Sequence, residues 1–369
     1  MLRRILKNKT LSIKKRIQRL IEYYRIFRGS KILWRNRYRR LVLLYPYLNL
    51  PEDRLIERAH SRYWKPFHHH INLTTLRVCK HISGISNPKY IPEEIFVTDI
   101  EPTLNQTSSV EYLTYKSFYN HWFPGSIFPQ DYFHNIDGAW FDGSLTPIDY
   151  NAIKTIAAEL DYPVVFKPNK DTGGGKDIHF PENNNQLIDL IENKKNFLVQ
   201  EKIRQHTFFD QFNHQGINTL RVNLYRSVID NKLNIINIVL RMGVGGSLDN
   251  ETAGGVVSLV KSDGFLNGFA VDKYGKKYTK HPDTEVLFDK QIPEFDIVKN
   301  TSISIAQRCF FARLVALDLC YDANGRWRMI EVNINGSTIR FAQYHGTLFF
   351  DEFTDEVYEY CLQNHWSLH

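Results

Sequence analysis

The sequence lacks any long apolar run. Its 369 residues contain no stretch of about 18 consecutive apolar side chains, the length that a membrane-spanning helix needs. The longest apolar run near the N-terminus, Leu41–Tyr45, is too short for a signal-peptide core. Only four cysteines occur and none forms a CxxC pair, so neither a zinc ribbon nor a disulfide scaffold is indicated. We therefore expect a cytoplasmic protein.

Acidic residues are almost missing from the first 40 positions. This segment holds 15 lysines and arginines but a single acid, Glu22, which gives it a local charge of +14. The rest of the chain then carries −7, so the net charge of +7 comes entirely from the N-terminal segment. A strongly basic chain can bind nucleic acid, but the acidic balance of the remainder disfavours that partner for the body of this protein.

The basic segment has the pattern of an amphipathic helix. Apolar side chains recur at helical spacing from Ile13 to Phe27, which predicts a helix over residues 12–28. Basic side chains fill much of the remaining surface, and a second basic cluster lies between Arg35 and Arg40. Such helices bind anionic membrane surfaces. The alternatives are a helix that packs on the body with a solvated basic face, and a helix that binds nucleic acid.

The rest of the chain predicts an α+β protein with much antiparallel sheet rather than a regular βαβ alternation. We expect a basic helical arm at 1–45 and a mixed, mainly helical region at 46–110. A subdomain at 111–200 contains a Gly-rich loop, and a second subdomain at 201–369 contains the main metal candidates.

The first chemical signal is a strand that ends in a lysine and is followed by a Gly-rich loop. Phe166–Pro168 precedes the loop Thr172–Lys176. The backbone N–H groups of such a loop can cover phosphates, while lysines supply positive charge. The spacing satisfies neither the P-loop nor the dinucleotide-binding pattern.

The second signal consists of Asp318, Glu331 and Asn333. Asp318 lies on an apolar strand, and a four-residue turn, Asp322–Gly325, leads into the strand that carries the other two. Glu331 and Asn333 are two residues apart and therefore share one face of that strand. A hairpin would bring these three together as an oxygen-rich site suited to Mg²⁺. A salt-bridged hairpin end is the structural alternative.

The third signal is the apolar strand Phe197–Gln200, which ends in charged residues at Glu201 and Lys202. The backbone at such a strand end can contact the edge of an adenine ring.

Taken in chain order, these features resemble the ATP-grasp superfamily over roughly residues 111–350. The resemblance implies the ATP-grasp fold, two α+β subdomains that clasp ATP, here with an N-terminal basic helical extension. It implies ATP and Mg²⁺ as cofactors. The positions that match the family's nucleotide and metal contacts are Lys116, Lys167, Gly173, Gly174, Gly175, Lys176, Gln200, Glu201, Lys202, Ile203, Asp318, Glu331 and Asn333.

A narrower resemblance is to the sugar-transfer-associated ATP-grasp group, related to α-L-glutamate ligases. This resemblance depends on residues 216–222, 240–243, 249–255 and 264–284. Many ATP-grasp ligases have an arginine two residues before the metal-binding aspartate, where this chain has Ala316. The resemblance then leaves Arg241 and Arg221, with Lys176, as the catalytic candidates. His206 and Asp210 are candidates for the ribose contact. Asn250, His281, Asn335 and Arg340 are the substrate candidates.

The resemblance implies an ATP-dependent carboxylate–amine ligase that forms an amide through an acyl phosphate. The group's association with surface polysaccharides favours a carboxylate-bearing sugar or amino acid as substrate. An anionic membrane surface is the expected partner of residues 1–40, at the inner face of the membrane, and nucleic acid is not expected. The alternatives are a phosphotransferase and a non-catalytic nucleotide-binding scaffold at the membrane.

Overall fold

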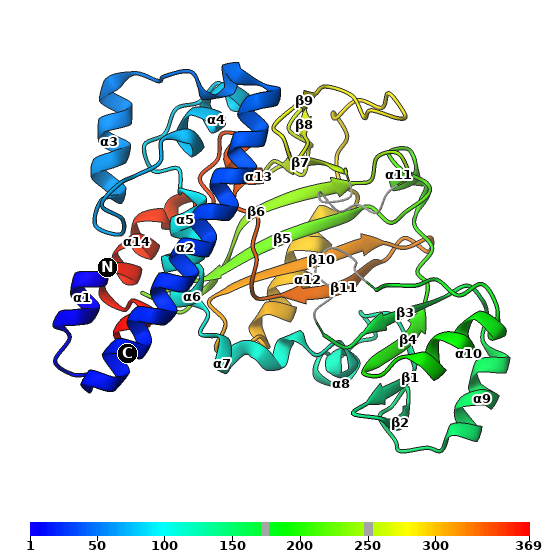
Figure 1. Cartoon of the computed structure of the whole chain (residues 1–369). Helices are drawn as coiled ribbons and strands as arrows, with labels where there is room; N and C mark the ends of the chain where they lie inside the picture. Colours follow the sequence, from blue (N-terminus) through cyan, green and yellow to red (C-terminus); the bar gives the residue numbers. More distant parts are fainter. Residues whose placement is uncertain (171–176, 247–253) are drawn as a thin grey trace.

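A computed structural model describes residues 1–170, 177–246 and 254–369 (Figure 1). Two antiparallel sheets organise the chain after the N-terminal helices. The smaller sheet has the strand order β2-β1-β4-β3, and the larger has the order β11-β10-β5-β6-β7-β8-β9. The α+β class and the helical N-terminal region are therefore as expected from the sequence.

The smaller sheet has a single apolar face. Its strands are β1 (Asp131–Ile136), β2 (Ala139–Asp142), β3 (Val164–Pro168) and β4 (Phe197–Glu201). Alternate residues such as Phe166 and Val199 pack against α9 (Tyr150–Glu159) and α10 (Asn184–Asn193). Because side chains alternate across a strand, Val165 and Lys167 point to the opposite face. That face is turned toward the larger sheet.

The larger sheet alternates in the same way. Its strands are β5 (Thr219–Arg226), β6 (Leu233–Met242), β7 (Val256–Val260), β8 (Ala270–Val271), β9 (Lys277–Tyr278), β10 (Leu314–Tyr321) and β11 (Trp327–Asn333). On one face, Leu220, Leu240 and Leu317 join a core that is closed by α12 (Phe295–Gln307). Arg221 and Asp318, one position along their strands, therefore lie on the other face.

The remaining α-helices come mainly from the N-terminal third and the C-terminal end of the chain, and several of them pack on the larger sheet. They are α1 (Leu2–Lys7), α2 (Ile13–Leu44), α3 (Arg54–Trp64), α4 (Thr74–Ser83), α5 (Glu93–Ile95), α6 (Glu101–Leu104), α7 (Thr107–Val110), α8 (Tyr119–Trp122), α11 (Thr207–Asp210), α13 (Arg340–Tyr344) and α14 (Thr354–Gln363). Trp34 and Leu41 of α2 share a core with Val239 and Val257 of the sheet. Helix α4 ends at Gly84, whose φ of +81° suits a residue without a Cβ atom.

The long helix of the basic arm, α2, continues well beyond the predicted helix end near residue 28, so that boundary is wrong. Helix α2 runs from Ile13 to Leu44, since the single Gly29 does not interrupt a sequence otherwise rich in good helix formers. It packs on the body through a row of buried side chains: Tyr23, Ser30, Trp34, Tyr38 and Leu41. Within the part of the chain that the structure describes, no helix is both long and apolar enough to cross a bilayer.

A buried carboxylate ties the arm and the C-terminal segment to the body. Asp99 is fully buried, and the hydroxyl of Tyr23 donates to it over 3.1 Å. Its oxygens also lie 2.7 Å from Nε2 of His68 and 3.0 Å from Nε2 of His365. Burial alone would raise the pKa of Asp99, but the two imidazoles overcome that effect and hold it well below its usual range. The triple-histidine segment thus supplies a structural contact through His68.

Replacing Asp99 with asparagine should lower the free energy of unfolding by about 3–5 kcal/mol, because it removes one partner of a buried charged network. Urea unfolding followed by circular dichroism measures the loss. The matched control is Asp355→Asn, an exposed carboxylate 2.5 Å from Lys89, for which we expect about 1 kcal/mol or less. Equal losses in the two variants would contradict the role assigned to Asp99.

Candidate active site

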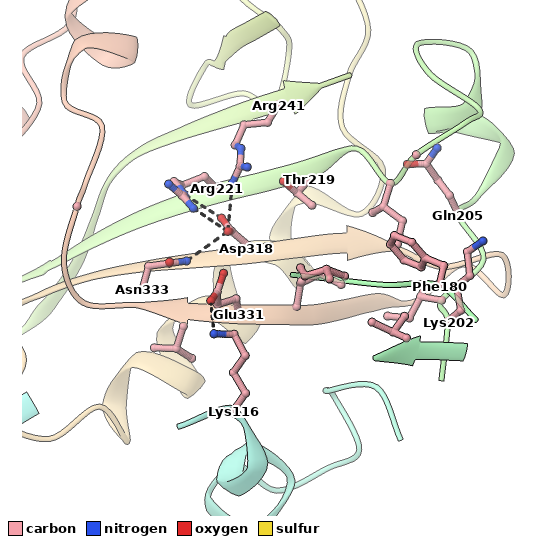
Figure 2. A pocket seen from close by; sticks show the side chains of 18 of the residues that line it. Lys116, Phe180, Lys202, Gln205, Thr219, Arg221, Arg241, Asp318, Glu331 and Asn333 are labelled. Carbon is pink, nitrogen blue, oxygen red and sulfur yellow. Dashed lines mark hydrogen bonds and ion pairs between the residues drawn. The ribbon is translucent and has the colours of Figure 1, made fainter. Parts of the chain in front are cut away.

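The two sheets enclose a cleft of about 1290 Å³. Its walls come from the polar face of the larger sheet, the open face of the smaller sheet, the linker after β4 and part of helix α2. Figure 2 shows charged side chains gathered on β5, β6, β10 and β11, with Lys116 approaching from the opposite wall. Most of the chemical signals in the sequence therefore meet in one cavity.

The strand register brings the acidic residues together. Asp318 of β10 pairs directly with Glu331 of β11, and Asn333 follows two residues later on the same face. On its other side, Asp318 pairs with Arg221 of β5. Arg241 of β6 lies one strand farther and shares this face of the sheet (Figure 2). The predicted hairpin forms and places its three oxygen-bearing residues side by side.

Asp318 is the centre of a charged network. Arg221 donates to both of its oxygens over 2.8 and 2.7 Å, and Arg241 donates to Oδ2 over 3.1 Å. The side-chain amide of Asn333 donates to the same oxygen over 3.2 Å. Burial raises the pKa of Asp318, yet the two guanidiniums outweigh it and hold the pKa below its usual value. Asp318 is therefore ionised near neutral pH.

The donor set fits a magnesium ion that is shared with phosphates. Two carboxylates and the amide oxygen of Asn333 are hard oxygen ligands, the type that Mg²⁺ prefers. Glu331 keeps 27% of its side chain exposed to the cleft. Among the described residues, no cluster of three or more His, Cys, Asp or Glu side chains could hold a metal by itself. A metal here would need further ligands from a substrate, as Mg²⁺ usually does.

Two buried lysines of the smaller subdomain lie near this carboxylate group. Nζ of Lys116 lies 2.9 Å from Glu331, although the lysine is only 5% exposed. Lys167 is also buried, and desolvation together with the charge of Lys116 lowers its pKa to about 8. Glu331 and Asp131 partly offset that effect. Lys116 lines the cleft, whereas Lys167 is not among its lining residues.

The linker after β4 forms an apolar slot at the other end of the cleft. Glu201, Lys202 and Ile203 line it, together with Val165 and Phe180. A slot with aliphatic and aromatic walls suits a flat heterocycle. Sequence reasoning missed Phe180, because no motif connects it with the linker.

Two of the residues predicted around this linker do not line the cleft. Gln200 is buried within β4 and is not among the residues that line the cleft. His206 caps helix α11, since its Nδ1 accepts the backbone N–H of Phe208. Asp210, the other ribose candidate, does line the cleft and accepts a hydrogen bond from Gln205 over 2.9 Å.

The substrate candidates have different positions. Asn335 and Arg340 line the cleft. His281 does not: it is fully buried, and its Nε2 lies 3.0 Å from the carbonyl oxygen of Gly243, which is a loop-capping contact. Asn250 lies outside the described residues, as do four predicted phosphate contacts, Gly173, Gly174, Gly175 and Lys176.

A second buried carboxylate supports the segment that follows the metal candidates. Glu101, at the start of α6, is 7% exposed and accepts the backbone N–H of Ser337 over 2.9 Å. Residues 334–338 line the cleft, so this hydrogen bond holds one of its walls. Burial raises the pKa of Glu101 to about 7, despite the hydrogen bonds that lower it.

This raised pKa predicts a pH dependence of stability. Between its usual value of 4.5 and about 7, Glu101 holds a proton in the folded state that it loses in the unfolded state. The folded state then binds more protons, so the free energy of unfolding falls as the pH rises through this window. We expect the fall to be on the order of 2–3 kcal/mol, and to disappear in Glu101→Gln. Urea unfolding from about pH 5 to about pH 8 measures it, with the exposed Glu182→Gln as control. The same slope in the Glu101 variant would contradict the assignment.

Comparison with known proteins gives one family match. Residues 184–349 match the sugar-transfer associated ATP-grasp family. This segment runs from α10 to just beyond α13 and includes Arg221, Arg241, Asp318, Glu331 and Asn333. Lys116 and Lys167 precede it, so their roles rest on the cleft geometry and stay predictions. A comparison with curated proteins yields no match.

Solved structures give distant similarities. The ATP-grasp ligase PsnB, complexed with a phosphomimetic variant of its minimal precursor, Mg and ADP, is 14% identical with a TM-score of 0.39, over 70% of this chain and 61% of that chain. The biotin carboxylase domain of 2-oxoglutarate carboxylase from Hydrogenobacter thermophilus is 13% identical with a TM-score of 0.39, over 64% and 45% of the two chains. The L-amino acid ligase from Bacillus licheniformis is 12% identical with a TM-score of 0.33, over 64% and 41%.

The matched region spans less than two thirds of each of these solved chains, 61% of PsnB in the first comparison. The family match covers the strands that carry the acidic residues and both cleft arginines. The resemblance inferred from the motifs is therefore confirmed: residues 184–349 of this chain match the sugar-transfer associated ATP-grasp family.

Proposed function

We propose that this protein is an ATP-dependent carboxylate–amine ligase that uses ATP with Mg²⁺. The observation that carries the proposal is the convergence of Asp318, Glu331 and Asn333 with Arg221 and Arg241 on one cleft face. Phosphoryl transfer depends mainly on positioning and charge neutralisation, and this face supplies both.

The nucleotide would lie across the cleft. The apolar slot beside Ile203 and Phe180 suits the adenine ring, and Asp210 lies in the same cavity as a partner for ribose hydroxyls. Lys116 and Lys167 then neutralise phosphate oxygens from the wall opposite Glu331. ATP binding would also relieve the repulsion between these two ammonium groups, because the phosphates bring the missing negative charge.

Mg²⁺, held by Asp318, Glu331 and Asn333, would supply charge neutralisation for the phosphate oxygens. Arg221 holds Asp318 in place through its two hydrogen bonds. Arg241 donates one hydrogen bond to Asp318 and lines the cleft. We assign it to the γ-phosphoryl group and then to the oxyanion of the tetrahedral intermediate, where a preorganised donor has its largest effect.

The proposed reaction has two steps. A substrate carboxylate oxygen attacks the γ-phosphorus, the bond to the bridging oxygen breaks, and ADP leaves. An amine then attacks the acyl carbon, loses a proton, and displaces inorganic phosphate to form the amide. The family match supports a sugar-linked substrate, and we propose a carboxylate-bearing sugar or its precursor in surface-polysaccharide synthesis.

Trapping with hydroxylamine tests the reaction class. The protein is incubated with ATP, Mg²⁺ and a panel of uronic acids and amino acids, and ADP and hydroxamate are both measured. The ligase reaction forms one hydroxamate for each ADP released. ADP release with a stable phosphorylated product and no hydroxamate would instead support a phosphotransferase.

We also propose that helix α2 holds the protein on an anionic membrane surface at the cytoplasmic face. Ile13, Ile17, Ile21 and Tyr24 form an exposed row, each more than half exposed, on the first turns of the helix. Exposed basic side chains, among them Lys14, Arg25 and Arg28, lie around the row. An apolar row among cationic side chains is complementary to lipid with anionic headgroups.

Sedimentation with vesicles tests this surface. Full-length protein is mixed with phosphatidylcholine vesicles with and without phosphatidylglycerol. We expect binding only to the anionic vesicles, with a loss of about tenfold or more in the double variant Ile17→Asp/Ile21→Asp. The control is Ile229→Asp, at a side chain that is 81% exposed on the turn between β5 and β6. Equal binding by the arm variant and the control would contradict the proposal.

A further inference from the structure

Helix α2 contributes a wall to the active-site cleft, as well as covering the sheet. Leu33, Trp34 and Arg37 line the same cavity as Glu331 and Asn333. In Figure 1, α2 crosses beside the larger sheet on the side away from the smaller sheet, so this wall lies at the end of the cleft opposite the adenine slot. Helix α2 lies outside residues 184–349, the segment that the family model matches.

Two guanidiniums converge on this wall. Cζ of Arg37 lies 4.9 Å from the centre of the Trp34 ring, and Cζ of Arg340 lies 5.3 Å from it. The side chain of Arg340 is only 4% exposed, with Glu93 3.8 Å behind it. Contact with an aromatic face and a buried carboxylate fixes the direction of a guanidinium, so Arg340 is preorganised rather than free to rotate.

The other residues of this wall are uncharged. Val97, Gly336, Ser337 and Thr338 complete it, and no acidic side chain lies among the described lining residues at this end. Leu33 adds a half-exposed aliphatic surface. A buried arginine held in one orientation and a second arginine over the same indole ring, beside aliphatic and hydroxyl-bearing residues, suit an anionic group attached to a polar ring.

The geometry points to a second substrate subsite here, in which Arg37 and Arg340 bind the anionic group of a sugar substrate. This inference rests on the proposed ligase function and assigns its substrate class and position. The segment 334–338 connects Asn333 with Arg340, so a sugar held by the two arginines lies in the same cavity as the phosphate end of the nucleotide. Carboxylate and phosphate groups share the required chemistry, and experiment separates them.

Substrate binding to full-length protein tests the subsite. Calorimetry with the non-hydrolysable analogue AMPPNP and Mg²⁺ already bound measures the affinity for glucuronate, galacturonate, glucose 1-phosphate and neutral glucose. We expect one anionic sugar to bind at least about tenfold more tightly than glucose. Arg37→Gln should lose about tenfold or more of that affinity while AMPPNP binding is unchanged. The control is Arg39→Gln, an exposed arginine on the same helix.

A second variant introduces a repulsive charge without changing the buried contacts of Arg340 with Trp34 and Glu93. Leu33 is 56% exposed, so Leu33→Glu should fold, and it should weaken the binding of anionic sugars but leave that of AMPPNP unchanged. Preference for the uronates identifies a carboxylate, and preference for glucose 1-phosphate identifies a phosphate. Unchanged affinity in both variants, or no preference for any anionic sugar, overturns the subsite while nucleotide binding stands. If the wild-type protein does not bind AMPPNP, the proposed function itself is refuted.

Discussion

Glu331→Gln is expected to reduce ATP turnover by at least about 10³-fold, while the protein stays folded. Glutamine keeps the shape of the side chain and a hydrogen-bond acceptor for Lys116, but it removes the charge that a magnesium ligand needs. The substitution should lower the free energy of unfolding only slightly, because Glu331 keeps 27% of its side chain exposed and makes one ion pair, to Lys116. ADP release, with a uronic acid panel present, measures the loss.

Two controls make the result specific to the metal assignment. Glu182→Gln changes an exposed carboxylate outside the cleft and should turn over like the wild-type protein. Circular dichroism and the unfolding midpoint of Glu331→Gln should stay close to those of the wild type. Turnover within a few-fold of the wild type in this variant would refute the role of Glu331, because no other carboxylate faces Asp318 across the β10–β11 pairing.

The acidic part of this site could be predicted because its determinants are local. A short turn joins the strands of Asp318 and Glu331, so the hairpin forces them together, and Asn333 follows from the two-residue repeat of a strand. The contact of Arg221 with Asp318 is different. The two residues are 97 positions apart, and their pairing depends on the order of strands in the sheet. The sequence shows Ala316 where an arginine is usual and leaves Arg221 as a candidate, but it does not show that Arg221 contacts Asp318.

For the N-terminal arm, the sequence predicts the helix but not the surfaces that the helix contacts. Helical periodicity predicted the first turns of α2, and the exposed row from Ile13 to Tyr24 corresponds to the predicted apolar face. The same pattern does not reveal what the helix contacts. In the sequence, Arg37 belongs to a basic cluster that follows Trp34, whereas the structure buries Trp34 and brings Arg37 to the cleft. Such a role depends on tertiary packing between segments far apart in the chain.

Arg241→Lys is expected to lower kcat by about 10²–10³-fold and to leave the affinity for ATP within a few-fold of the wild-type value. Lysine keeps the positive charge near Asp318 but lacks the planar fork of donors that fits a phosphoryl group or an oxyanion. An interaction that strengthens only in the transition state appears in kcat rather than in substrate binding. Single-turnover ADP formation and calorimetry with AMPPNP measure the two quantities separately.

Arg221→Lys is the matched comparison, because Arg221 and Arg241 contact the same carboxylate from neighbouring strands. Arg221 makes two hydrogen bonds to Asp318, whereas Arg241 makes one, so the Arg221 variant should loosen Asp318 and raise the Mg²⁺ concentration needed for half-maximal turnover. The Arg241 variant should keep the wild-type Mg²⁺ requirement. If both variants change only the Mg²⁺ requirement, Arg241 positions Asp318 and does not touch the reacting atoms. If Arg241→Lys alone lowers kcat at saturating Mg²⁺, the two guanidiniums have separate tasks, one in holding a metal ligand and one in the chemical step.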